Sequence, residues 1–127
     1  MLVKRCGPLL IVALLLLLLP ARASADQEIT ISAADFKFEP ATISVNKGDV
    51  VHFTVTNNGQ RPHNVEFELE SADVETKLFD TNLQAGETRT VHYTFEHAGT
   101  WAMYCPVGSH RSNGMESTAE VAEASGY

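Results

Sequence analysis

Hydrophobic and polar residues alternate with a period of two along four segments of the chain. In the clearest of them, Val51, Phe53 and Val55 are separated by polar side chains. The segments span residues 29–32, 51–56, 65–70 and 91–96. This period is typical of β-strands that bury one face and expose the other.

Short turn-forming sequences separate the alternating segments. Each contains a glycine beside polar or small residues, and they lie at 46–49, 57–60, 85–87 and 98–100. Several short strands at this spacing predict an all-β fold, a two-sheet Greek-key β-sandwich.

Residues 71–83 break the alternating pattern. Val74, Leu78 and Phe79 recur there at helix-like spacing. We expect a short irregular or helical crossover in this stretch, with one or two helical turns.

The first 25 residues have the layout of a secretory signal peptide. Lys4 and Arg5 precede an apolar run at 9–19, and the small residues 23–25 follow it. This predicts a periplasmic or otherwise extracytoplasmic protein. An uncleaved membrane anchor is the alternative, although the apolar run is short for a membrane span.

Removal of residues 1–25 leaves 102 residues, enough for one domain at 26–127. It also removes three basic residues and no acidic ones, so the predicted mature chain has a net charge of −10. Such an acidic chain is a poor partner for nucleic acid. The charge favours basic partners, or serves solubility alone.

Cys105 is the only cysteine of the predicted mature chain, since Cys6 lies in the signal segment. No intramolecular disulfide is therefore possible in a compartment where disulfides normally form. An inert buried cysteine is the simple alternative. It leaves unexplained why His110 and Met115 follow at regular spacing.

The residues Cys105, His110 and Met115 are each separated by four others, and His63 lies upstream. Soft sulfur ligands with imidazole suit copper, and a His₂Cys set with a weak axial Met is the ligand list of a blue-copper electron-transfer site. Cys105, His110 and Met115 fit one loop between two strands. His63 comes from another loop.

The other three of the five histidines are not expected to bind metal. His52 and His92 fall on the polar phase of their strands, which predicts that both are exposed. His97 lies beside a predicted turn. The chain has no His-x-His pair, which argues against the trinuclear centre of a multicopper oxidase.

Met103 and Met115 are assigned different roles. Met103 shares the phase of Trp101 and Cys105, so it is expected to point into the core. Met115 follows Asn113 and Gly114 at the position of an axial ligand. Plain core packing at the start of the last strand is the alternative for Met115.

Together these segments resemble the cupredoxin family, the plastocyanin- and azurin-like small blue copper proteins. The similar segments are 45–57, 62–65, 98–101 and the loop that begins at Cys105. The loop spacing is similar to that of auracyanin and rusticyanin. The resemblance covers nearly all of the predicted mature chain.

The resemblance implies a one-electron carrier with one mononuclear type 1 copper, bound by His63, Cys105, His110 and Met115. It implies no enzymatic activity and no small-molecule substrate. Redox proteins such as cytochromes or membrane oxidoreductases would be the partners of a monomer. A periplasmic copper-binding protein for copper delivery or sequestration is the alternative, although the chain has no cluster of methionines. A metal-free sandwich would leave the Cys-His-Met spacing unexplained.

One residue departs from the family pattern. Pro106 stands where the family has Ser or Thr, so the usual hydrogen bond to the side chain of Asn64 is lost. The backbone N–H of Asn64 is expected to donate to the thiolate, and Val107 offers a second N–H. Two donors to sulfur favour a moderately high reduction potential.

Two further features surround the predicted site. Arg111 follows His110 as a lone cation, which predicts a docking face less negative than the rest of the surface. Phe36 and Phe38 are expected to pack under the ligand loops. Asp35 beside them is assigned no chemistry.

Overall fold

The computed structural model describes Leu18 and residues 25–124, so the predicted signal segment lies almost wholly outside the described part. The described part contains nine strands and one 3₁₀ turn. The strands are β1 (Asp26–Ala34), β2 (Lys37–Glu39), β3 (Thr42–Asn46), β4 (Val50–Asn57), β5 (Glu66–Leu69), β6 (Val74–Lys77), β7 (Thr88–Thr94), β8 (Gly99–Tyr104) and β9 (Glu116–Ala122). No helix in this part is long and apolar enough to cross a membrane.

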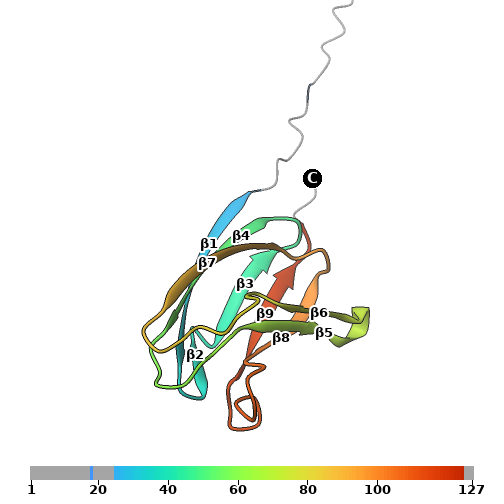
Figure 1. Ribbon diagram of the computed structural model, residues 1–127. Helices are drawn as coiled ribbons and strands as arrows, with labels where there is room; N and C mark the ends of the chain where they lie inside the picture. The colour runs from blue at the N-terminus through green and yellow to red at the C-terminus, as the bar shows by residue number, and fades with distance from the viewer. Residues whose placement is uncertain (1–17, 19–24, 125–127) are drawn as a thin grey trace, which may run out of the picture.

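The strands form two sheets that pack face to face (Figure 1). One sheet has the order β2-β1-β4-β7, and the other has the order β3-β9-β8-β5-β6. The pairs β1 with β4 and β3 with β9 are parallel, and the remaining pairs are antiparallel. The predicted all-β, two-sheet sandwich is confirmed.

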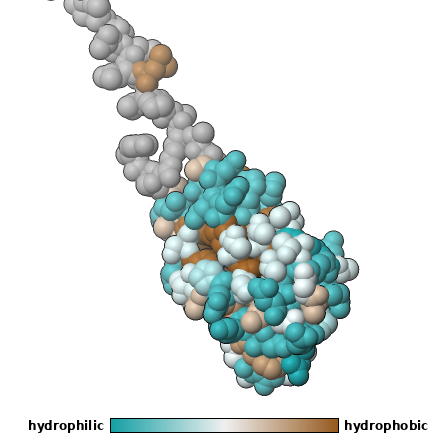
Figure 2. All heavy atoms as spheres, turned by 90° about the vertical axis from the view of Figure 1, so that its left-hand side faces the viewer, coloured by the Kyte–Doolittle hydropathy of each residue, from teal (hydrophilic) through white to brown (hydrophobic). Residues whose placement is uncertain are grey.

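The core between the sheets is built around four aromatic rings, as the alternating pattern predicts. Phe53, Phe67, Phe95 and Trp101 are fully buried. Phe95 packs edge-on against Trp101 at 5.2 Å and against Phe67 at 5.1 Å between ring centroids. Burial of each such ring contributes about 1.5–3 kcal/mol. The face of the molecule seen in Figure 2 is mainly hydrophilic, with hydrophobic residues visible in limited areas.

The crossover at 71–83 differs in part from its prediction. A 3₁₀ turn (Glu70–Ala72) ends at Asp73, and the chain then forms β6, which pairs antiparallel with β5. The helical interpretation of Val74 is therefore wrong. β6 lies at the edge of its sheet, and its inner face is buried only in part. The polar Thr76 can therefore stand on this face, where a buried strand would have an apolar residue. For this reason the alternation of hydrophobic and polar residues is weak in β6.

Two loops meet at one end of the sandwich and carry the predicted ligands. One joins β4 to β5 and contains His63, and the other joins β8 to β9 and runs from Cys105 to Met115. The β8–β9 loop projects at the bottom of Figure 1, away from the start of β1 and the end of β9. Function should therefore be sought at this end.

Candidate metal centre

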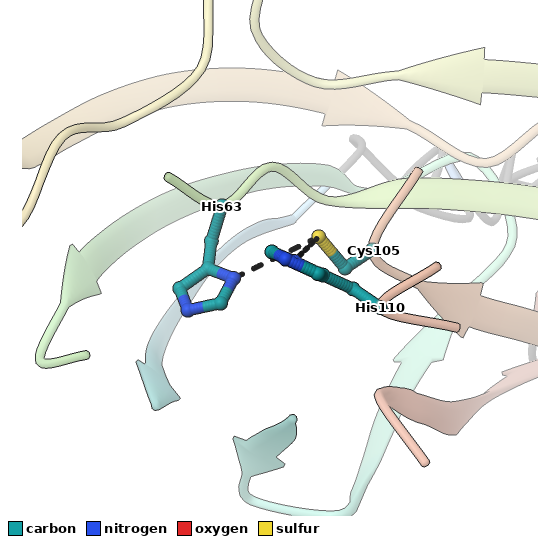
Figure 3. Close-up of side chains that lie close together, drawn as sticks. All are labelled: His63, Cys105 and His110. Atoms are coloured by element: carbon teal, nitrogen blue, oxygen red, sulfur yellow. Dashed lines mark hydrogen bonds between the residues drawn. The ribbon is translucent and has the colours of Figure 1, made fainter. Parts of the chain in front are cut away.

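Three predicted ligands come together in a buried cluster. The Sγ atom of Cys105 lies 3.8 Å from Nδ1 of His63 and 3.5 Å from Nδ1 of His110. All three donor atoms lie within 4.8 Å of one another. Figure 3 shows the three side chains pointing toward one another, with His63 from the β4–β5 loop and the other two from the β8–β9 loop.

The β8–β9 loop is closed by its own backbone hydrogen bonds. The N–H of Cys105 donates to the carbonyl of Met115, and the N–H of Met115 donates to the carbonyl of His110. Gly108 and Gly114 have φ values of +47° and +106°, which glycine adopts most easily. The loop therefore folds back on itself and brings His110 beside Cys105.

The segment that carries His63 is held from both sides. His63 and Leu83 exchange two backbone hydrogen bonds of 3.1 and 2.8 Å. The side chain of Asn57 donates to the carbonyls of Arg61 and Leu83 at 2.7 and 2.9 Å. His63 is 1% exposed, so its ring has little freedom.

A carboxylate that the sequence analysis left without a role holds the far side of the His63 ring. Oδ1 of Asp35 lies 3.0 Å from Nε2 of His63 and also accepts the backbone N–H groups of Gln60 and Arg61. With Asp35 as acceptor, His63 carries its proton on Nε2, and the Nδ1 lone pair faces Cys105. Desolvation acts to raise the pKa of Asp35, but the hydrogen bonds from Gln60, His63 and Arg61 hold it below its usual value.

Gly59 permits this close approach. A Cβ atom at position 59 would lie 2.4 Å from Oδ1 of Asp35 and 2.9 Å from Nε2 of His63. Both distances are far below van der Waals contact, so a larger residue would displace the carboxylate or the ring.

The sulfur of Cys105 receives the two predicted backbone donors. Burial raises the pKa of the Cys105 thiol, while hydrogen bonds from the N–H groups of Asn64 and Val107 act in the opposite direction. The Asn64 side chain instead donates to the carbonyl of Phe79 at 2.8 Å and to Asn82 at 3.1 Å. The Asn64 side chain thus has partners other than residue 106.

His110 lies between the cluster and the surface. It is 8% exposed, and the ring of Phe36 packs edge-on against it at 5.4 Å. Burial lowers the pKa of His110, and the neighbouring His63 and Arg61 lower it further. The neutral imidazole, which can bind a metal, is favoured.

Met115 and Met103 are both fully buried. The core position of Met103 is confirmed. The backbone of Met115 is bonded to Cys105 and to His110, which places the residue beside two ligands. Its role as axial ligand stays a prediction.

The remaining histidines lie outside the cluster. His92 and His97 are exposed, and His52 is partly exposed on the same outer sheet face as His92. The predicted exposure of His92 and His97 is confirmed, whereas His52 is exposed only in part. Phe38 is 3% exposed and belongs to the core.

Arg111 is not the lone cation that the sequence suggested. Its guanidinium donates to Glu116 at 3.0 and 3.1 Å and to Glu68 at 3.1 Å, and it lies 3.8 Å from the ring centre of Tyr104. Two carboxylates therefore offset its charge. Glu68 lies 43 positions before Arg111, so sequence analysis could not predict this pairing.

Comparison with known proteins places the chain in a family. The profile of the family described as "Cupredoxin-like domain" matches residues 7–115. The plastocyanin of Prochlorothrix hollandica is 30% identical over 126 residues, which cover 93% of each chain.

Solved structures share the fold at lower sequence identity. Reduced auracyanin from Roseiflexus castenholzii has a TM-score of 0.66 and 19% identity, covering 78% of this chain and 99% of its own. The blue copper oxidase of Nitrosomonas europaea has a TM-score of 0.65 and 23% identity, but this chain spans 40% of the oxidase chain. Because the family profile covers most of the sequence and the plastocyanin relative matches along nearly its whole length, the chain belongs to the cupredoxin family.

Proposed function

We propose that this protein is an extracytoplasmic one-electron carrier with one copper ion held by His63, Cys105, His110 and Met115. The observation that carries the proposal is the buried cluster of one thiol and two imidazoles. Membership of the cupredoxin family and the similarity to plastocyanin and auracyanin support it.

The donor set fits copper. Zn²⁺, which uses the same ligand types, has bonds of about 2.0 Å to histidine nitrogen and about 2.3 Å to thiolate sulfur in proteins. The sulfur–nitrogen distances of 3.5 and 3.8 Å are shorter than the sum of these bonds, so an ion can contact the sulfur together with either nitrogen. All three donor atoms lie within 4.8 Å of one another, which supports a shared site. Bound copper would supply one-electron cycling between Cu(I) and Cu(II).

The protein contributes a rigid and water-poor site. Asp35 fixes the His63 ring, and the backbone of the β8–β9 loop fixes Cys105 relative to His110. The Asn64 and Val107 N–H groups stabilise negative charge on sulfur. A site that is held in this way changes little between two redox states, which favours fast electron transfer.

Copper delivery or sequestration is the second candidate. It would favour accessible ligands, whereas Cys105 is fully buried and His63 is 1% exposed. An enzymatic role is not proposed, because the similarity to plastocyanin and auracyanin supports a carrier.

Location and partners are part of the proposal. The layout of residues 1–25 supports export. We propose redox proteins, such as cytochromes or membrane oxidoreductases, as partners of a monomeric carrier, in keeping with the electron-carrier role.

The test is the visible spectrum of the oxidised, copper-loaded protein. An intense thiolate-to-copper band, with a reversible one-electron wave in voltammetry, is the expected result. A weak spectrum without that band, together with rapid loss of copper to a chelator, would overturn the carrier proposal in favour of copper delivery.

A further inference from the structure

A second histidine pair lies on the outer face of the sheet β2-β1-β4-β7, away from the central cluster. His52 on β4 and His92 on β7 are direct cross-strand partners. Their ring centroids are 4.0 Å apart, with an interplanar angle of 57°. Both side chains reach solvent, with His52 31% exposed.

Carboxylates lie beside this pair. Oδ1 of Asp26 is 3.7 Å from Nε2 of His52, within ion-pair distance. Glu28 on β1 is the register partner of His52, so Glu28, His52 and His92 form a row across three neighbouring strands. Register partners point to the same face of a sheet. The row therefore combines two imidazoles with nearby negative charge.

The adjacent rows on β4 and β7 carry no charged side chain. Val50 pairs with Thr94 on one side, and Thr54 pairs with Thr90 on the other. No cation in these rows competes for the imidazole nitrogens or for the carboxylates. The local charge thus favours a divalent cation.

We propose that His52 and His92 form an accessory chelating site for a borderline divalent ion, Zn²⁺ or Cu²⁺, with Asp26 as the outer carboxylate. Imidazole suits both ions, and among divalent ions Cu²⁺ binds nitrogen sites most strongly. Directly opposed residues on antiparallel strands have Cβ atoms about 4.5–5.5 Å apart, close enough for both rings to contact one ion. The site contains no thiolate, so it differs in kind from the central cluster.

The sheet keeps the cost of forming this site low. β4 is paired on both sides, with β1 and with β7, which fixes the backbone of His52, and the pairing of β7 with β4 holds the backbone of His92 beside it. Only side-chain rotation is needed to turn the two rings toward a shared ion. His97, in contrast, is an exposed histidine outside any strand and provides a matched control.

The experiment is a titration of the full, copper-loaded and reduced protein with Zn²⁺ alone. Calorimetry should give one Zn²⁺ per chain, and NMR should show shifts of the His52 and His92 ring signals while those of His63 and His110 stay in place. His52→Gln and His92→Gln should each weaken binding by about 100-fold, because a second ligand on the same scaffold adds a factor of this order. Asp26→Asn should weaken it by about tenfold, as loss of an outer partner typically does.

The controls distinguish this site from Zn²⁺ binding elsewhere on the surface. His97→Gln should leave Zn²⁺ binding unchanged, and thermal melts should show that all variants are folded. Equal loss in the His97 variant, or wild-type binding in the His92 variant, would overturn the proposal. Failure of copper to bind the central cluster would appear as a missing thiolate band in the oxidised protein, before reduction and addition of Zn²⁺, so it would not be confused with failure of the surface site.

Discussion

The molecule contains two pairs of neighbouring histidines whose rings are arranged in nearly the same way. The rings of His63 and His110 are 5.0 Å apart at 59°, and those of His52 and His92 are 4.0 Å apart at 57°. The first pair is buried and shares a thiol, whereas the second reaches solvent beside carboxylates. Imidazole geometry alone therefore does not define an electron-transfer site. The sulfur, the burial and the surrounding hydrogen bonds make the difference.

The largest change should come from removal of the sulfur. Cys105→Ser should abolish the intense thiolate-to-copper band, because oxygen cannot replace the soft ligand. Absorption spectra of the copper-loaded variant measure this. Circular dichroism of the metal-free form should show the fold retained, and a band that survives the substitution would show that Cys105 is not the ligand.

A larger side chain at position 59 should disturb the buried pair of His63 and His110, because it would displace Asp35 from the His63 ring. In Gly59→Ala the new Cβ would collide with Asp35 and His63, and overpacking of this kind costs about 1–3 kcal/mol. The thermal unfolding temperature and the affinity for copper should both fall. Gly86→Ala is the control, since its Cβ would meet open space although its φ is +81°. It should lower stability alone, and an equal loss of copper affinity in both variants would contradict the steric role of position 59.

The axial position tests whether Met115 belongs to the site. Met115→Gln should retain copper and lower the reduction potential, since a harder oxygen donor favours Cu(II). Voltammetry measures the shift, and the buried Met103→Leu serves as a control for core packing. An unchanged or higher potential in the Met115 variant would count against its assignment as a ligand.

A smaller effect is expected from the charge behind His63. Asp35→Asn keeps an oxygen acceptor near Nε2 but removes a negative charge, so the oxidised site loses stabilisation and the potential should rise. We expect about a tenfold change in the redox equilibrium, or about 59 mV for one electron. Asp26→Asn changes the net charge equally at the surface pair and should leave the potential nearly unchanged. Equal shifts in both variants would mean that the charge, and not the contact with His63, is responsible.

Local patterns predicted most of the fold and three members of the buried cluster. Alternation identified the strands that bury Phe53 and Phe67, because one buried face leaves a period of two in the sequence. The short spacing between Cys105 and His110 predicted that they lie close together in one loop. The comparison with the family predicted the backbone N–H groups that donate to the sulfur.

Contacts between distant segments escaped prediction. Asp35 lies 28 positions before His63 and Glu68 lies 43 before Arg111, so no local spacing marks either contact. The edge strand β6 was missed because its inner face is only partly buried. In each case the information resides in the packing of elements that are remote in sequence.

The parallel pairing of β3 with β9 has a consequence for how the protein is made. Thr42 is the register partner of Thr118, so the second sheet cannot close until β9 has been synthesised. Pairings between segments so far apart fold slowly, on the order of milliseconds to seconds. The β8–β9 loop precedes β9 directly, so its Cys105 and His110 reach their places only as this last strand docks. Strand β9 should therefore be synthesised before the metal-binding cluster can assemble.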